Sequence, residues 1–116
     1  MIELLVVLAI IALLLTIAAP RYFGGIAKAK DNVLRENLYT LRQSIDQFYA
    51  DKGHYPATLD ELVTQHYLRQ IPVDPIVENN TSWTTVAPTN ASTGAVFDVK
   101  SAAPGKGLDG TSYSSW

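Results

Sequence analysis

The amino-acid sequence offers few residues that could carry chemistry, and the most unusual is an acidic residue at the head of an apolar segment. Glu3 precedes a run from Leu4 to Ala19 in which Thr16 is the only polar side chain. A carboxylate in the middle of a bilayer is penalised by roughly 2.5–3.5 kcal/mol on insertion scales. Glu3 therefore lies either at the level of the lipid headgroups, where the penalty is small, or in an assembly that supplies a cationic partner.

The second interpretation of Glu3 requires a partner from another chain. The next basic residue along the sequence is Arg21, about 27 Å away if the segment between them is one helix. The N-terminal amine of a neighbouring copy is the simplest candidate for a cation that lies closer to Glu3.

Arrangements typical of enzymes are not found in the sequence. His54 and His66 lie on polar stretches without metal-ligand spacing, and the chain contains no cysteine. The carboxylates Asp46, Asp51, Asp60 and Glu61 fit helix faces and caps better than a general acid–base pair. No nucleophile elbow and no glycine-rich phosphate loop can be identified. We therefore expect a protein that is not an enzyme.

The charge balance excludes one further class of function. Nine Lys and Arg residues stand against eleven Asp and Glu residues, which gives a net charge of −2. Nucleic-acid binding depends on clustered basic side chains that neutralise phosphates. Nucleic acid is therefore not an expected partner.

The apolar run is at the lower limit for a membrane span, which needs roughly 17–25 residues. A cleaved signal peptide is the main alternative, but it would have a basic start and a small-residue cleavage site. Here the chain starts Met1-Ile2-Glu3, and Pro20 follows the two alanines. We therefore expect a helix that anchors the chain in a membrane.

The helical pattern continues beyond the apolar run. Apolar residues recur at alternating steps of four and three, the spacing of one helix face, at Leu34, Leu38, Leu41, Ile45 and Phe48. The polar residues between them are expected to form a solvated face: Lys30, Asp31, Arg35, Glu36, Arg42, Gln43 and Asp46. One helix is predicted from Ile2 to about Ala50, ending near Lys52-Gly53. Because such a helix is roughly 75 Å long, its first half must be buried in lipid and then in other copies of the chain.

The predicted helix has a weak point in its middle. Pro20 removes an intrahelical hydrogen bond, and Gly24 and Gly25 each cost up to about 1 kcal/mol relative to alanine. Two compatible interpretations follow. The helix is kinked at the membrane surface, or the weak point is a hinge that lets the apolar half change its neighbours.

A small domain is predicted after the long helix. Thr58 and Glu61 have the spacing of a capping box that would start a short helix. Its Leu59, Leu62 and Val63, with Leu68 after them, would face the core. Two short strands are expected at Ser82–Val86 and Ala95–Val99. The sequence thus predicts an α+β fold, with an N-terminal apolar helix over 1–25 and a globular domain over 26–116.

The last residues of the chain are rich in glycine and serine, yet they end with Trp116. Such a composition is typical of disorder. Because a large aromatic side chain is unfavourable in water, we expect Trp116 to pack back on the domain and to hold the tail in place.

These features together resemble the type IV pilin-like superfamily. Met1-Ile2-Glu3-Leu4-Leu5-Val6-Val7 is similar to the start of its mature chains, and Pro20 stands where the family carries a helix-breaking proline. Further stretches resemble the major pseudopilin of type II secretion: Tyr49-Ala50-Asp51-Lys52-Gly53-His54-Tyr55-Pro56, Leu59, Leu62, Ile71-Pro72-Val73-Asp74-Pro75, Asp98-Val99-Lys100-Ser101 and Trp116.

The resemblance implies a homo-oligomer that forms a helical filament. The monomer would lie in the bacterial inner membrane, where a prepilin peptidase processes it and its N-terminus is methylated. Minor pseudopilins and the secretion assembly platform are the implied partners, and the filament would push folded proteins through an outer-membrane channel. In this family the glutamate that corresponds to Glu3 pairs with the N-terminal amine of the adjoining subunit, although Glu3 stands two positions earlier in this sequence.

The resemblance also implies calcium as a cofactor. The family binds this ion in its C-terminal loop through several aspartates, and Asp109 matches one of them. Pro104-Gly105 and Gly110 stand where others would be. Calcium takes six to eight oxygen ligands, so Asp109 is the one carboxylate of a small expected ligand set.

Two other functions remain open at this point. The chain could be the major subunit of a true type IV pilus, which serves adhesion, motility or DNA uptake and appears at the cell surface. It could also be a monomeric binding domain on a membrane anchor. The cysteine pair that commonly closes the C-terminal loop of true pilins is missing here, which favours the pseudopilin.

Overall fold

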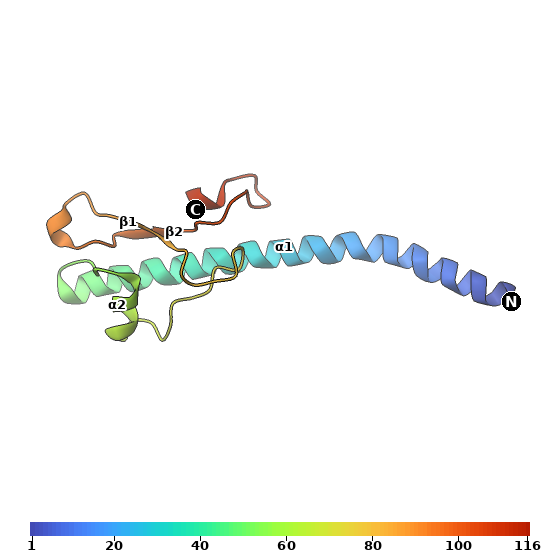
Figure 1. The fold of residues 1–116 in the computed structure, drawn as a ribbon, viewed down its shortest axis with the longest axis horizontal. Coiled ribbons are helices and arrows are strands. Elements are labelled where there is room, and N and C mark those ends of the chain that lie inside the picture. Colours follow the sequence, from blue (N-terminus) through green and yellow to red (C-terminus); the bar gives the residue numbers. More distant parts are fainter.

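The fold is dominated by one helix that runs the full length of the molecule. A computed structural model describes the backbone of all 116 residues and the side chains of residues 1–19, 24–90 and 92–116. Helix α1 (Ile2–Lys52) is gently curved, and the molecule measures 77 × 27 × 19 Å (Figure 1). The other elements gather along the second half of α1, so the single long helix predicted from the sequence is confirmed.

Helix α1 ends where its sequence predicts. Gly53 adopts the left-handed conformation with φ +77°, and its N–H donates to the Tyr49 carbonyl oxygen at 2.8 Å. Glycine takes this conformation without the steric cost that a side chain would bring. Lys52 lies in the last turn, next to the negative end of the helix dipole.

Helix α2 (Leu59–Thr64) follows after a short loop. Thr58 is its N-cap residue, but the Thr58 side chain makes no capping hydrogen bond. Instead, a carboxylate oxygen of Glu61 accepts the N–H of Ala57 at 2.7 Å. The predicted capping box is therefore wrong in both of its hydrogen bonds, although the helix does begin after Thr58. The predicted burial of Leu59 and Leu62 is confirmed.

The sheet has two short antiparallel strands, β1 (Thr84–Val86) and β2 (Asp98–Lys100), with Thr85 opposite Val99. Both strands start later than predicted. The N–H of Ser82 donates to the side chain of Asn79, and the N–H of Val96 donates to the Pro56 carbonyl oxygen. These hydrogen bonds occupy donors that a longer ladder would need. Two 3₁₀ turns, η1 (Ala91–Thr93) and η2 (Tyr113–Ser115), complete the chain.

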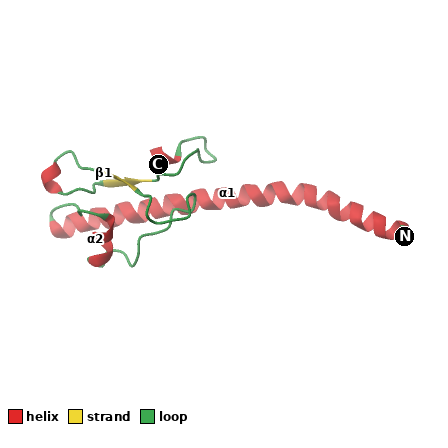
Figure 2. Ribbon diagram, viewed as in Figure 1, coloured by secondary structure: helices red, strands yellow, loops and turns green.

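The core lies between α1, α2 and the sheet. In Figure 2 the strands run beside α1, and α2 lies on another side of the same helix. The predicted apolar face of α1 is buried in full, and the other core side chains come from the small domain: Leu59, Leu62, Trp83, Val96 and Val99. The architecture is α+β, as predicted.

A buried carboxylate joins the loop before β1 to the segment after β2. Asp74 is 2% exposed, accepts the Ser101 hydroxyl at 2.5 Å, and accepts the N–H of Ile76 at 2.9 Å. The indole N–H of Trp83 donates to the Pro72 carbonyl oxygen at 2.9 Å, which fixes the same loop. The Pro72–Pro75 turn is thus held by side chains that are distant in sequence.

Candidate functional site

The N-terminal third of α1 is an apolar surface without cover. From Ile2 to Ile17 the large apolar side chains are 48–77% exposed. Thr16 satisfies its hydroxyl within the helix by donating to the Leu13 carbonyl oxygen at 2.6 Å. Of the helices that the structure describes, α1 is the one long and apolar enough to cross a membrane. A helix that is apolar all round is stable only when lipid or other helices surround it.

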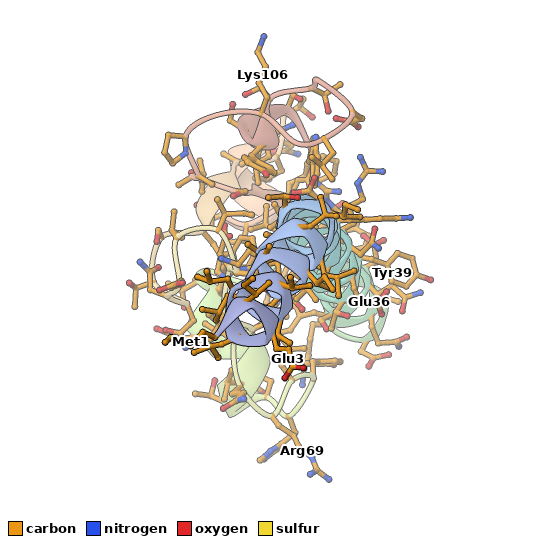
Figure 3. All side chains as sticks on the ribbon, turned by 90° about the vertical axis from the view of Figure 1, so that its right-hand side faces the viewer. Met1, Glu3, Glu36, Tyr39, Arg69 and Lys106 are labelled. Carbon is orange, nitrogen blue, oxygen red and sulfur yellow. The ribbon has the colours of Figure 1, made fainter. Side chains whose placement is uncertain are left out.

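Glu3 lies at the free end of this surface, in the first turn of α1. Figure 3, which looks along α1 from its N-terminal end, shows the Glu3 side chain pointing outward from the helix. Within the part of the chain whose side chains are described, the ion pairs are Arg35–Asp109 and Arg42–Asp98, so neither involves Glu3. The carboxylate is therefore available to a group from another molecule.

The predicted weak point lies at the junction of the two halves of α1. The side chain of Pro20 lies outside the described residues, so its role as a helix break stays a prediction. Gly24 and Gly25 are exposed, and a β-carbon added to either would meet no atom within 4 Å. Packing within the chain therefore does not require glycine at these two positions.

Trp116 lies against the C-terminal loop and the long helix. Its ring makes an edge contact with Tyr113 at a centroid distance of 5.0 Å, and its indole N–H donates to the Thr111 hydroxyl at 2.6 Å. Gly107 lies directly below the ring, because a β-carbon there would be 2.3 Å from the Trp116 ring carbon. The tail is thus ordered around this tryptophan.

Asp31 is the residue of α1 that receives the tail. It is 7% exposed, and its two carboxylate oxygens accept the Tyr113 hydroxyl at 2.7 Å and the Leu108 N–H at 2.8 Å. The hydrogen bond to Asp31, together with burial, raises the pKa of Tyr113 to about 12. A negative charge at Asp31 disfavours a second negative charge on the phenol oxygen.

Two arginines of α1 bind the tail at further points. Arg35 donates to Asp109 at 2.6 Å, and its guanidinium lies 4.3 Å from the centroid of the Trp116 ring. Arg42 donates to Asp98 at 2.8 Å and to the Val99 carbonyl oxygen at 3.0 Å, and it also contacts the main-chain oxygen of Trp116. Arginine suits such a place because its planar group makes several hydrogen bonds and stacks on aromatic rings.

The prediction of a uniformly solvated polar face on α1 is wrong for Asp31, and Arg42 is half-buried. A signal for Asp31 was present in the sequence. Asp31 precedes Leu34 by three residues and Leu38 by seven, which places it on the same face as the apolar stripe. An acidic residue in phase with core positions indicates a buried carboxylate that has polar partners.

Asp109, the residue expected to bind calcium, has partners within the chain on both of its carboxylate oxygens. One carboxylate oxygen of Asp109 contacts Arg35, and the other accepts the N–H of Thr111 at 2.9 Å and its hydroxyl at 2.6 Å. The hydrogen bonds from Thr111, and then the Arg35 guanidinium, hold the pKa of Asp109 below its usual value. Among residues 1–19, 24–90 and 92–116, no three His, Cys, Asp or Glu side chains lie together in a group that could hold a metal ion.

The two histidines do not form a catalytic arrangement. His54 makes an edge contact with Phe48 at a ring distance of 5.5 Å, and its Nδ1 lies 3.0 Å from the Tyr55 carbonyl oxygen. His66 is exposed and has a φ of +68° in the turn after α2. Both therefore occupy structural positions at the edge of the domain.

One known protein is similar to this chain over part of its length. Over 65 residues, the chain is 35% identical to a protein of Xanthomonas campestris pv. campestris named type II secretion system core protein G. The alignment covers 56% of this chain and 46% of that protein, so the chain matches under half the length of its relative. No family model and no solved structure matches the chain. The similarity confirms the resemblance to a type II secretion protein.

Proposed function

We propose that this chain is a structural subunit of a type II secretion pseudopilus and polymerises through α1 into a helical filament. The observation that carries the proposal is the apolar surface from Ile2 to Ala19, which is exposed along its length and is headed by a carboxylate. The name of the similar protein supports the same kind of machine. In this proposal the chain is a structural protein and not an enzyme.

The apolar half of α1 has two environments in this proposal. In the monomer it anchors the chain in the bacterial inner membrane, where lipid covers its side chains. In the filament the apolar halves of many copies form the centre, and lipid is no longer needed. A filament in the periplasm would then push folded proteins through an outer-membrane channel.

Glu3 controls the step between these environments. A carboxylate enters an apolar bundle at a high cost unless a cation is paired with it. The N-terminal amine of the adjoining copy supplies that cation, because it lies at the same end of an identical helix. A copy that enters in register is therefore favoured over one that enters out of register.

The proposal includes partners that act on the monomer and on the growing end. A prepilin peptidase processes the N-terminus, which is then methylated, and the secretion assembly platform adds each subunit. Minor pseudopilins form the first part of the filament. Each of these steps rests on the resemblance to type II secretion.

The experiment uses a bacterium that has a type II secretion system and lacks its own major pseudopilin. The full chain and a Glu3→Gln variant, which keeps the shape of the side chain without its charge, are produced in this strain. We expect filaments in electron micrographs and restored export for the unchanged chain. For Glu3→Gln we expect equal membrane insertion and at least a tenfold loss of filaments, since one lost ion pair in an apolar bundle exceeds about 1.4 kcal/mol.

A matched control is Glu36→Gln, which removes an exposed carboxylate from the second half of the same helix. It should leave filament formation unchanged. Filaments from Glu3→Gln at the level of the unchanged chain would contradict the role of Glu3. Surface filaments that restore retraction-dependent motility, and not export, would favour the type IV pilus instead.

A further inference from the structure

The C-terminal loop, residues 101–116, packs on α1 through charged side chains of the helix. Asp31 occupies both of its carboxylate oxygens with the loop, one on Tyr113 and one on the N–H of Leu108. These two contacts join positions that are 82 and 77 residues apart in sequence. A single buried carboxylate thus fixes the loop at two places.

The two arginines that follow hold the rest of the loop. Arg35 reaches Asp109 and covers the Trp116 ring, and Arg42 reaches the main chain of Trp116. We call these six residues the α1–tail clamp: Asp31, Arg35, Arg42, Asp109, Tyr113 and Trp116. Its two arginines and two aspartates balance in charge.

Several oxygen atoms of the loop already have donors within the chain. The carbonyl oxygens of Gly105, Gly107 and Thr111 accept the N–H groups of Tyr113, Gly110 and Gly107 at 3.3, 3.0 and 2.9 Å, respectively. The Asp109 carboxylate accepts from Arg35 and Thr111. A divalent cation of the calcium type needs six to eight oxygen ligands. A cation at Asp109 would have to compete with Arg35 and with the Thr111 donors for the same carboxylate.

We propose that the α1–tail clamp holds the C-terminal loop in its native place without a divalent cation. Arg35 occupies the side of Asp109 to which a cation would bind, so a positive side chain on α1 replaces a positive ion. The clamp acts within a single chain, whether or not the chain forms filaments.

The first experiment measures the thermal unfolding of the full chain in detergent micelles, with excess EDTA or with millimolar CaCl₂. We expect the two Tm values to agree within about 2 °C. A cation at a hundred times its dissociation constant would raise the Tm of a domain of this size by at least about 10 °C. A calcium-dependent rise of that size would overturn the proposal.

The second experiment tests the clamp itself with Tyr113→Phe, which removes one hydroxyl and leaves the ring. We expect the Tm to fall by about 6 °C or more, because a hydrogen bond to a charged group contributes about 1.5–3 kcal/mol and each kcal/mol shifts the Tm of a domain of this size by about 4–8 °C. Quenching of Trp116 fluorescence by acrylamide should increase, and CaCl₂ should restore neither property. Trp116→Phe identifies the emission that belongs to this residue.

The matched control is Tyr39→Phe, because Tyr39 is an exposed tyrosine of α1 whose hydroxyl accepts from the nearby Gln43. A Tm change for Tyr113→Phe no larger than that for Tyr39→Phe would overturn the clamp. Arg35→Gln tests the clamp with the fold intact, since both partners of the Arg35–Asp109 ion pair are about half exposed. Acrylamide quenching of Trp116 should increase in this variant as well, and an unchanged quenching would contradict the role of Arg35. If the unchanged chain binds calcium and Asp109→Asn does not, the proposal is contradicted directly.

Discussion

The hydroxyl of Tyr113 donates a hydrogen bond of 2.7 Å to the carboxylate of Asp31, across 82 residues of sequence. This contact joins the last turn of the chain to a buried position of α1. The two ends of the globular part are thus joined by a polar interaction whose acceptor, Asp31, is buried. A polar group that is buried with its partner is stable, whereas the same group without a partner is costly.

Because of the Tyr113–Asp31 contact, we expect one tyrosine to lose its proton at an unusually high pH. The pKa of Tyr113 is raised from 10.0 to about 12, so below pH 10 both the folded and the unfolded chain keep the proton, and the stabilisation is complete. Between about pH 10 and 12 the unfolded chain loses this proton first, so the contribution decreases and is lost above the folded pKa. The tyrosinate absorbance of the unchanged chain minus that of Tyr113→Phe measures the titration.

A control separates Asp31 from simple burial. In Asp31→Asn the charge is removed, and the titration of Tyr113 should move back toward the ordinary value. The pKa of Tyr67 is also raised, by burial and then by Asp51, and the same substitution should leave it unchanged. Titration of Tyr113 near pH 10 in the unchanged chain would contradict the contact.

The sequence predicted the parts of the fold that depend on local spacing. Leu34, Leu41 and Phe48 follow the period of a helix, and Gly53 is a strong local stop signal, so α1 could be read directly. The burial of Asp31 is signalled by its phase in this stripe, but its partner Tyr113 is remote in sequence and could not be predicted. No local pattern indicates a contact that only the folded chain creates.

The candidate site also has residues that the sequence indicated and residues that it did not. Glu3 is conspicuous in sequence because its neighbours are apolar over a long range, and its role in assembly stays a prediction. Arg35 and Arg42 look like ordinary surface charges until the tail is placed on them. The shortened strands have a similar cause, since Pro56 lies far from Val96 in sequence yet takes its N–H.

Asp74 predicts a coupled loss of stability. The Asp74→Ala variant leaves the Ser101 hydroxyl and the Ile76 N–H without their acceptor in a buried place. Each unpaired group costs about 1–3 kcal/mol, so we expect a loss of at least about 2 kcal/mol. Ser101→Ala alone should cost less, and the double variant should cost less than the sum, because the two residues share one interaction. Urea unfolding of the full chain in detergent measures all three, and strictly additive losses would contradict the coupling.

Gly94 predicts a steric effect that can be separated from backbone strain. Its φ is +125°, and a β-carbon there would lie 2.2 Å from the Tyr55 carbonyl oxygen. Gly110 also has a positive φ, at +84°, but has open space around it. Both alanine variants lose about 1 kcal/mol or more to strain, and only Gly94→Ala adds a clash with main-chain atoms. Gly94→Ala should therefore lower the Tm clearly more than Gly110→Ala, and equal losses would show that the loop moves freely away from Tyr55.

If the middle of α1 acts as a hinge, replacing Gly24 and Gly25 by alanine should raise the helix content and lower the yield of filaments. The double change to alanine meets no neighbouring atom, and it stabilises the helix by up to about 1 kcal/mol per residue. Helix content measured in detergent should therefore rise, while the yield of filaments falls, because a stiffer helix resists the change between lipid and filament. Asn32→Ala is the matched control, since it exchanges an exposed residue of α1 for a better helix former outside the weak point. If the double variant forms filaments as readily as Asn32→Ala and the unchanged chain, then the glycines mark only a kink at the membrane surface, and the hinge is excluded.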